Sequence, residues 1–258
     1  MIDRPFIKVW RDGAVGHIEL NRPEAFNALN RQMMSAIVGA LQTFDEDAET
    51  AVVVISGAGR AFAAGADIDE MAGDDPVRLE MVDPFAVWDQ IRLIRKPLLA
   101  AVHGFALGGG FELALSCDLI FAAENTQFGF PEVKLGVMPG AGGTVKLTKA
   151  LGRHKALEWL WTGARMTAEE ACAHGLVNRV VPADNLMEVA MKMARKLSEQ
   201  APLSLRLIKE TVNQAADLAL YEAMLIERKN FYLLFASEDQ KEGMAAFREK
   251  RKPVFKGR

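Results

Sequence analysis

Up to about Val181, the hydrophobic pattern of the chain alternates between short continuous apolar runs and helical spacing. A short apolar run predicts a buried strand, whereas apolar residues that recur every three or four positions predict an amphipathic helix. The expected strands cover residues 6–10, 15–20, 51–55, 98–102, 119–123, 127–129 and 177–181. Strands that alternate with helices in this way predict an α/β fold.

Local signals mark several ends of these elements. The first two strands are joined by an Asp-Gly turn at residues 12–13, which is typical of a hairpin. Asn30 is a good N-cap for a helix over residues 31–44. Residues 76–96 also have helical spacing, and Pro84 predicts a break within them. Two further helices are expected over residues 144–151 and 155–161.

The last third of the chain is expected to be almost entirely helical. Thr167 and Glu170 have the spacing of a capping box and predict the start of a helix over residues 168–174. After the last expected strand, the helical segments cover residues 186–198, 203–220, 221–235 and 239–252. We therefore predict a core domain over residues 1–197 and a C-terminal helical region over residues 198–258.

Composition excludes several classes of protein. The 31 basic and 34 acidic residues give a net charge of -3 and offer no electrostatic reason to expect nucleic acid as a partner. The longest apolar stretch, residues 97–123, contains two acids and many glycines, so no membrane span is expected. Cys117 and Cys172 lack metal-binding spacing. Unpaired cysteines and a start without a targeting pattern predict a cytoplasmic protein with no metal site.

The stretch from residue 102 to residue 118 carries the clearest chemical signal. Gly108, Gly109 and Gly110 stand between a strand-like and a helix-like run, so backbone N–H groups there are open to an anion or a developing oxyanion. Glu112 follows three residues after Gly109, on the same helix face. Burying an acid costs free energy, so a buried acid is expected to have either a function or a partner that compensates the cost. A tight turn with Glu112 paired to an arginine accounts for this stretch equally well.

Two more glycine-rich loops occur, at residues 56–67 and 136–143, but neither fits a known nucleotide motif. Phe62 and Val145 stand where a dinucleotide fingerprint needs its third glycine, and no Walker-type loop, G-x-S-x-G or H-E-x-x-H occurs. What remains is Glu132, a second acid among apolar or conformationally fixed neighbours. Two such acids with open backbone N–H groups favour general acid–base chemistry on a polarised carbonyl.

These segments together resemble the crotonase (enoyl-CoA hydratase/isomerase) superfamily. The resemblance is carried by residues 61–68, 104–113, 131–132 and 136–144, and by N-R-P at 21–23, N-A-L at 27–29 and K-E-G-M at 241–244 with Phe247. It covers nearly the whole chain in the right order. It implies that residues 1–197 form a spiral of repeated ββα units, and that residues 198–258 mediate assembly into a homotrimer or homohexamer.

The resemblance also implies the site. Glu112 and Glu132 match the two catalytic glutamates of true hydratases, and the N–H groups of Ala66 and Gly109 match the oxyanion hole for an acyl-CoA thioester. The other expected substrate contacts are Ala25, Phe26, Ala64, Asp67, Ile68, Gly140, Phe247 and Lys250, the last two reaching the CoA of a neighbouring subunit. Asp69 replaces a lysine of many hydratases, which puts a charge contact to CoA there in doubt. No cofactor is expected beyond the CoA of the substrate.

The implied activity is that of an enoyl-CoA hydratase, which adds water syn across the C2=C3 bond of trans-2-enoyl-CoA in fatty acid β-oxidation or related degradation. Glu132 is expected to deliver the proton to C2 and Glu112 to activate the water. A Δ3,Δ2-enoyl-CoA isomerase remains an alternative, as does an RNA-binding crotonase-fold protein, which only the basic residues at the C-terminus favour. Residues 71–88 are expected at the acyl end, although core packing explains their large side chains equally well.

Overall fold

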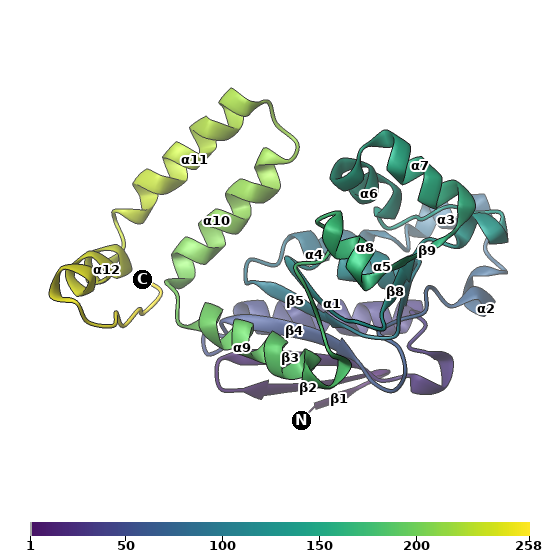
Figure 1. The fold of residues 1–258 in the computed structure, drawn as a ribbon, viewed down its shortest axis with the longest axis horizontal. Helices are drawn as coiled ribbons and strands as arrows, with labels where there is room; N and C mark the ends of the chain where they lie inside the picture. Colours follow the sequence, from purple (N-terminus) through teal and green to yellow (C-terminus); the bar gives the residue numbers. More distant parts are fainter. Residues whose placement is uncertain (1) are drawn as a thin grey trace.

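Two β-sheets organise the core of the computed structural model, which describes residues 2–258 (Figure 1). The larger sheet has seven strands in the order β1-β2-β3-β4-β5-β7-β10. These strands are β1 (Ile2–Arg4), β2 (Ile7–Asp12), β3 (Val15–Leu20), β4 (Val52–Gly57), β5 (Leu98–Val102), β7 (Leu119–Ala123) and β10 (Arg179–Val181). From β3 to β10 every neighbouring pair is parallel. The α/β fold class is therefore confirmed.

The expected hairpin forms the antiparallel part of the larger sheet. β2 pairs with β3 so that Trp10 faces His17, and Gly13 in the connecting turn has a φ of 58°. A positive φ of this kind is readily adopted by glycine, which explains the Asp-Gly turn. The hairpin prediction is confirmed.

The smaller sheet contains β6 (Phe105–Leu107), β8 (Gln127–Gly129) and β9 (Arg165–Thr167). β6 is parallel to β8, and β9 is antiparallel to β8. The chain thus passes twice from a strand of the larger sheet to one of the smaller, from β5 to β6 and from β7 to β8, as expected of repeated ββα units wound in a spiral. The prediction that the strand over residues 98–102 leads directly into the glycine cluster is wrong, because β6 lies between them.

Helices cover both faces of the larger sheet. On one face α1 (Arg31–Glu46) begins at Asn30, whose side chain accepts a hydrogen bond of 2.8 Å from the N–H of Met33. On the other face α9 (Leu186–Ser198) packs Leu186, Ala190 and Ala194 against buried strand residues. The N-cap prediction is confirmed, and burial of these apolar faces stabilises the two layers.

The remaining core helices are short. They are α2 (Ile68–Met71), α3 (Pro76–Val82), α4 (Ala86–Arg92), α5 (Gly109–Ala114), α6 (Gly143–Leu151), α7 (Arg153–Thr162) and α8 (Ala168–Ala173). Three 3-10 helices are η1 (Pro23–Ala25), η2 (Glu132–Leu135) and η3 (Ala183–Asn185). The break expected at Pro84 separates α3 from α4, and Thr167 and Glu170 form the expected capping box.

Three helices extend away from the core at the C-terminal end: α10 (Pro202–Ala215), α11 (Leu220–Leu234) and α12 (Glu238–Glu249) (Figure 1). α10 ends earlier than expected, at Ala215, and Asp217 just beyond it pairs with Arg92 and Lys149 of the core. α12 ends at Glu249 because Lys250 adopts a left-handed conformation with a φ of 55°. The domain boundary at residue 197 remains a prediction.

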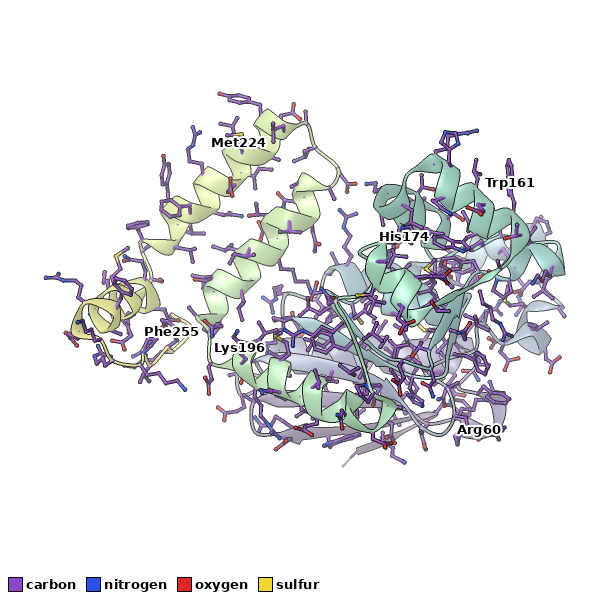
Figure 2. All side chains as sticks on the ribbon, in the orientation of Figure 1. Arg60, Trp161, His174, Lys196, Met224 and Phe255 are labelled. Carbon is purple, nitrogen blue, oxygen red and sulfur yellow. The ribbon has the colours of Figure 1, made fainter. Side chains whose placement is uncertain are left out.

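Many side chains of the C-terminal helices face outward rather than the core. Figure 2 shows Met224 on α11, away from the two sheets. Large apolar side chains of these helices with more than half of their surface exposed are Ile208, Val212, Leu220, Tyr221, Phe231, Tyr232, Leu233, Met244 and Phe247. Contiguous exposed apolar residues are typical of an interaction surface. None of the helices within residues 2–258 is both long and apolar enough to cross a membrane.

Candidate active site

Glu112 is held at the start of α5 by two backbone donors from another part of the chain. Its side-chain Oε1 accepts hydrogen bonds of 2.8 Å from the N–H groups of Ala141 and Gly143. The residue is 3% exposed. Within residues 2–258 it forms no ion pair with an arginine, so the arginine-paired alternative for this stretch is wrong.

Glycine at position 143 is required for this grip. A Cβ atom there would lie 2.6 Å from Cε1 of Phe130 and 3.0 Å from Cγ of Glu112. Such distances are too short for carbon atoms, so only glycine lets the start of α6 come this close to Glu112. The loop at residues 136–143 therefore binds the carboxylate of Glu112, a side chain of the protein itself.

Glu132 reaches the start of α5 from the first position of η2. A Cβ atom on Gly108 would lie 2.8 Å from its Oε1, so glycine at that position allows the close approach. Its Oε2 is buried and has no hydrogen-bond partner among the described residues. An unpartnered buried carboxyl oxygen is costly, and functional sites are where such groups are retained.

The surroundings of the two acids stabilise a negative charge to different extents. Burial raises the pKa of Glu112, but the N–H groups of Gly143 and Ala141 and the charge of Lys146 lower it in part. Burial raises the pKa of Glu132 to about 7, with a smaller contribution from the charge of Glu112. Neighbouring acids with different environments are suited to different acid and base roles.

The N–H groups of Ala66 and Gly109 are both open. Leu29 pairs with the two residues on either side of Ala66: its N–H donates to the carbonyl of Gly65, and its carbonyl accepts from the N–H of Asp67. The Ala66 N–H itself donates no hydrogen bond among the described residues. Gly109 is the first residue of α5 and has no acceptor within the helix. A Cβ atom on Gly109 would lie 3.5 Å from the Ala66 nitrogen, so the two donors are neighbours.

The loop that carries Ala66 is fixed by polar contacts to the segment after β3. The Asn27 side chain donates to the carbonyls of Ala58 and Ala61 at 2.9 and 2.7 Å. Arg22 pairs with Asp67 at 2.5 Å. That hydrogen bond is the main reason why the pKa of Asp67 is lowered. The Asp67 carboxylate, expected as a substrate contact, is therefore engaged by Arg22.

The other expected CoA contacts fall into two separated groups. Ala25, Phe26 and Ala64 lie together, because the N–H of Ala64 donates to the carbonyl of Phe26 at 3.0 Å. Ile68 begins α2 on the same loop and is 57% exposed. Phe247 is 85% exposed on α12, and Lys250 follows that helix. Figure 1 places α12 and α2 at opposite ends of the molecule, so one chain does not bring the two groups together.

Two aromatic side chains border the site at the expected acyl end. A Cβ atom on Gly140 would lie 2.8 Å from Cζ of Phe85, and one on Gly109 would lie 3.7 Å from Cη2 of Trp88. Phe85, Trp88 and Gly140 also line a cavity of about 900 Å³ between α4, α6 and α10. Met81, by contrast, is 81% exposed. The sequence alone did not separate these two aromatic residues from Met81.

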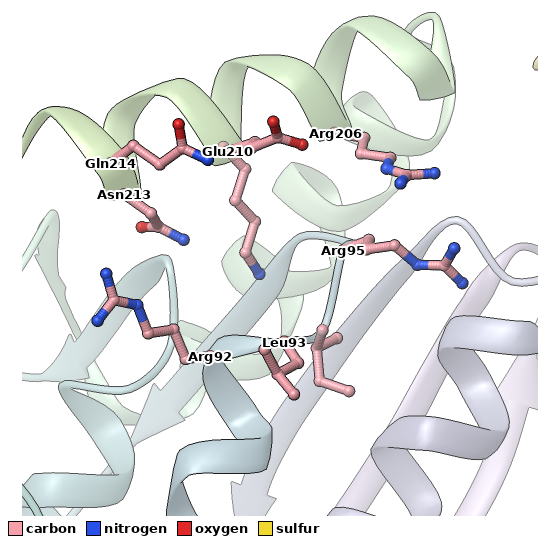
Figure 3. Close-up of a pocket in the computed structure, with 9 residues that line it drawn as sticks. Arg92, Leu93, Arg95, Arg206, Glu210, Asn213 and Gln214 are labelled. Atoms are coloured by element: carbon pink, nitrogen blue, oxygen red, sulfur yellow. The ribbon is translucent and has the colours of Figure 1, made fainter. Parts of the chain in front are cut away.

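A second pocket, of about 360 Å³, lies between the end of α4 and α10 (Figure 3). Its wall carries Arg92 and Arg95 from the core and Arg206 and Glu210 from α10. It contains none of the residues expected from the sequence, and it has no pair of acids. The candidate site is therefore defined by the two glutamates and not by this pocket.

Comparisons with known proteins agree with the resemblance. A family model described as enoyl-CoA hydratase/isomerase matches residues 11–258. A probable enoyl-CoA hydratase of Mycobacterium bovis is 49% identical and aligns over 96% of this chain and 97% of its own length. The 2,3-dehydroadipyl-CoA hydratase of Escherichia coli is 44% identical over 93% of this chain and 94% of its own length. A solved enoyl-CoA hydratase subunit from Geobacillus kaustophilus is 63% identical, with a TM-score of 0.96 over 98% of both chains.

Proposed function

The chain belongs to the enoyl-CoA hydratase/isomerase family, and from this premise we propose that it is an enoyl-CoA hydratase. The reaction is the reversible syn addition of water across the C2=C3 bond of a trans-2-enoyl-CoA, which gives a 3-hydroxyacyl-CoA. Such a step belongs to fatty acid β-oxidation or a related acyl-CoA degradation. The observation that supports it most is that Glu132 lies against the start of α5, which carries Glu112, and that the two acids have opposite hydrogen-bond environments.

The N–H groups of Ala66 and Gly109 act on the thioester carbonyl. When water adds to C3, negative charge develops on the thioester oxygen, and two fixed donors stabilise that charge more strongly than the ground-state carbonyl. Removing one such donor in other enzymes slows the reaction by roughly a hundredfold to a thousandfold. Hydrogen bonding also withdraws electron density from C3, which favours attack by water.

Glu112 and Glu132 move the protons of the reaction. Glu112 starts as a carboxylate stabilised by two N–H donors. It takes a proton from the water as the water oxygen bonds to C3. Glu132, whose pKa is about 7, starts protonated and delivers its proton to C2. Glu112 therefore gains one proton from water while Glu132 loses one to C2, and transfer of a proton from Glu112 to Glu132, directly or through solvent, restores the starting state before the next turnover.

The two alternatives have less support. An isomerase needs one base and leaves the second acid idle, whereas two acids with different environments suit addition of water. RNA binding would rely on the basic C-terminal residues, but Arg251, Lys252 and Arg258 are paired with glutamates.

We propose CoA contacts at Ala25, Phe26, Ala64, Asp67 and Ile68, a place beside the reacting carbons for Gly140, and CoA contacts from a neighbouring subunit at Phe247 and Lys250. The exposed apolar residues of α10 to α12 support assembly as a homotrimer or homohexamer. The reaction transfers no electrons, so we propose no cofactor beyond the substrate CoA. Cys117 and Cys172 are free thiols, which supports a cytoplasmic location.

The decisive experiment supplies trans-2-enoyl-CoA and trans-3-enoyl-CoA separately to the purified protein. Hydration removes the absorbance of the conjugated thioester from the first substrate, whereas isomerisation creates it from the second. We expect rapid hydration, and a fall in kcat of roughly a hundredfold or more for Glu112→Gln or Glu132→Gln. Faster conversion of the trans-3 substrate would identify an isomerase, and near-wild-type hydration by either variant would refute the assigned roles.

A further inference from the structure

Lys146 stands behind Glu112 on the first turns of α6 and has no role in the reaction described above. It is half-buried, and its Nζ donates a hydrogen bond of 2.6 Å to Oγ of Ser116. That hydroxyl in turn donates to the backbone carbonyl of Glu112 at 2.7 Å. Within residues 2–258 Lys146 forms no ion pair, whereas Lys149 on the same helix pairs with Asp217.

The start of α6 therefore holds Glu112 at two points. Ala141 and Gly143 bind its carboxylate, and Lys146 binds its carbonyl through Ser116. The two attachments lie about one helical turn apart on α6, so movement of α6 relative to α5 would disturb both. A half-buried ammonium group with only a neutral partner is costly to keep, and a nearby carboxylate compensates that cost.

We propose that Lys146 is a positioning residue that fixes α6 against α5 through Ser116 and keeps Glu112 in its charged, water-activating form. The proposal rests on the hydratase function given above. Lys146 touches neither the thioester nor the reacting carbons in this scheme and acts through Glu112.

The charges around Lys146 agree with this role. Burial lowers the pKa of Lys146, and the charge of Glu112 is the largest influence that raises it again. Asp89 and Arg92 of α4 also face Lys146 and act in opposite directions. Cys117 carries little charge near neutral pH, because burial raises the pKa of its thiol to about 12. Glu112 is therefore the main partner of the Lys146 charge.

The test is the pH profile of kcat for Lys146→Met. Loss of the ammonium group raises the pKa of Glu112, and Glu112 must be ionised to activate water, so the acid limb of the profile moves to higher pH. We expect kcat at neutral pH to fall by roughly tenfold while KM stays within about twofold, since the substrate contacts are unchanged. Lys146→Arg keeps the charge and should restore both kcat and the acid limb.

One further variant separates the effect of the Lys146 charge from that of its hydrogen-bonded link through Ser116, and a second serves as a control. Ser116→Ala keeps the charge but removes the link to Glu112, so kcat should fall with little movement of the acid limb. Lys149→Met is the matched control, because that lysine lies on the same helix in an exposed ion pair, and a wild-type profile is expected. Should Lys146→Met not fold, Lys146→Gln tests the same loss of charge while keeping a donor for Ser116.

The outcomes are distinguishable. A wild-type kcat and acid limb in Lys146→Met, an equal loss in Lys149→Met, or failure of Lys146→Arg to restore the profile would each overturn the role of Lys146. Absence of hydration by the wild-type protein would instead refute the proposed function and leave the contacts of Lys146 unaffected.

Discussion

Replacing Glu132 by glutamine should make the protein less active and more stable, and the gain in stability should depend on pH. Glutamine has nearly the same shape but cannot ionise. The pKa of Glu132 rises from its ordinary value of 4.5 to about 7 in the folded protein. The folded state therefore resists ionisation of this group, and wild-type stability falls as the pH rises from about 4.5 to about 7.

The size of the effect follows from the same pKa values. At about 1.4 kcal/mol for each pH unit, the rise from 4.5 to about 7 corresponds to at most about 3.4 kcal/mol. Because Glu132 is only half-buried, water screens part of this, and we expect about 2 kcal/mol. Glu132→Gln should then be more stable than the wild type by about 2 kcal/mol at pH 8 and by little near pH 4.

Urea denaturation of both proteins at these two pH values measures the difference, at one fixed protein concentration because assembly would add to stability. Glu124→Gln is a suitable control, since Glu124 is exposed in the loop just before β8, and no pH-dependent gain is expected. Equal stability of Glu132→Gln and wild type at pH 8, or the same gain at both pH values, would show that the folded state does not resist ionisation of Glu132.

Three further predictions follow from the site. Gly143→Ala should destabilise the fold by about 1–3 kcal/mol and lower kcat, because its Cβ would lie 2.6 Å from Phe130; a urea midpoint equal to wild type would contradict the packing. The wild-type kcat for hydration should decline above about pH 7 as Glu132 loses its proton, and a flat profile to pH 9 would exclude it as the acid. Arg22→Met should lower kcat by roughly tenfold, because loss of its ion pair with Asp67 loosens the loop that carries Ala66. Arg11→Met is the control: it removes only long surface ion pairs and should leave kcat unchanged.

Sequence patterns were sufficient for elements with many periodic positions or clear end signals. α1 and α9 have apolar faces several turns long, and Asn30 and Thr167 mark helix starts with side-chain hydrogen bonds that the structure contains. The three-residue strands β1, β6 and β9 were not predicted, whereas β8 and β10, which are equally short, were. Three residues are too few to show a period, so strands of this length are detected inconsistently.

The sequence singled out the two acids of the candidate site but not their contacts. Glu112 and Glu132 stood out because each is an acid in apolar or fixed surroundings. The donors to Glu112 come from residues 29 and 31 positions away, and Arg22 reaches Asp67 across 45 positions. Such contacts depend on how loops meet in three dimensions, and glycine runs show only that a close approach is possible.

The central claim is that one thioester oxygen is bound by the N–H groups of Ala66 and Gly109 while Glu112 and Glu132 face the same C2=C3 bond. A crystal structure with a bound, unreactive acyl-CoA thioester tests it most directly. The account predicts the thioester oxygen within about 3 Å of both nitrogens, with the two carboxyl groups beside C2 and C3. A thioester oxygen bound elsewhere, or carboxyl groups turned away from C2 and C3, would contradict it.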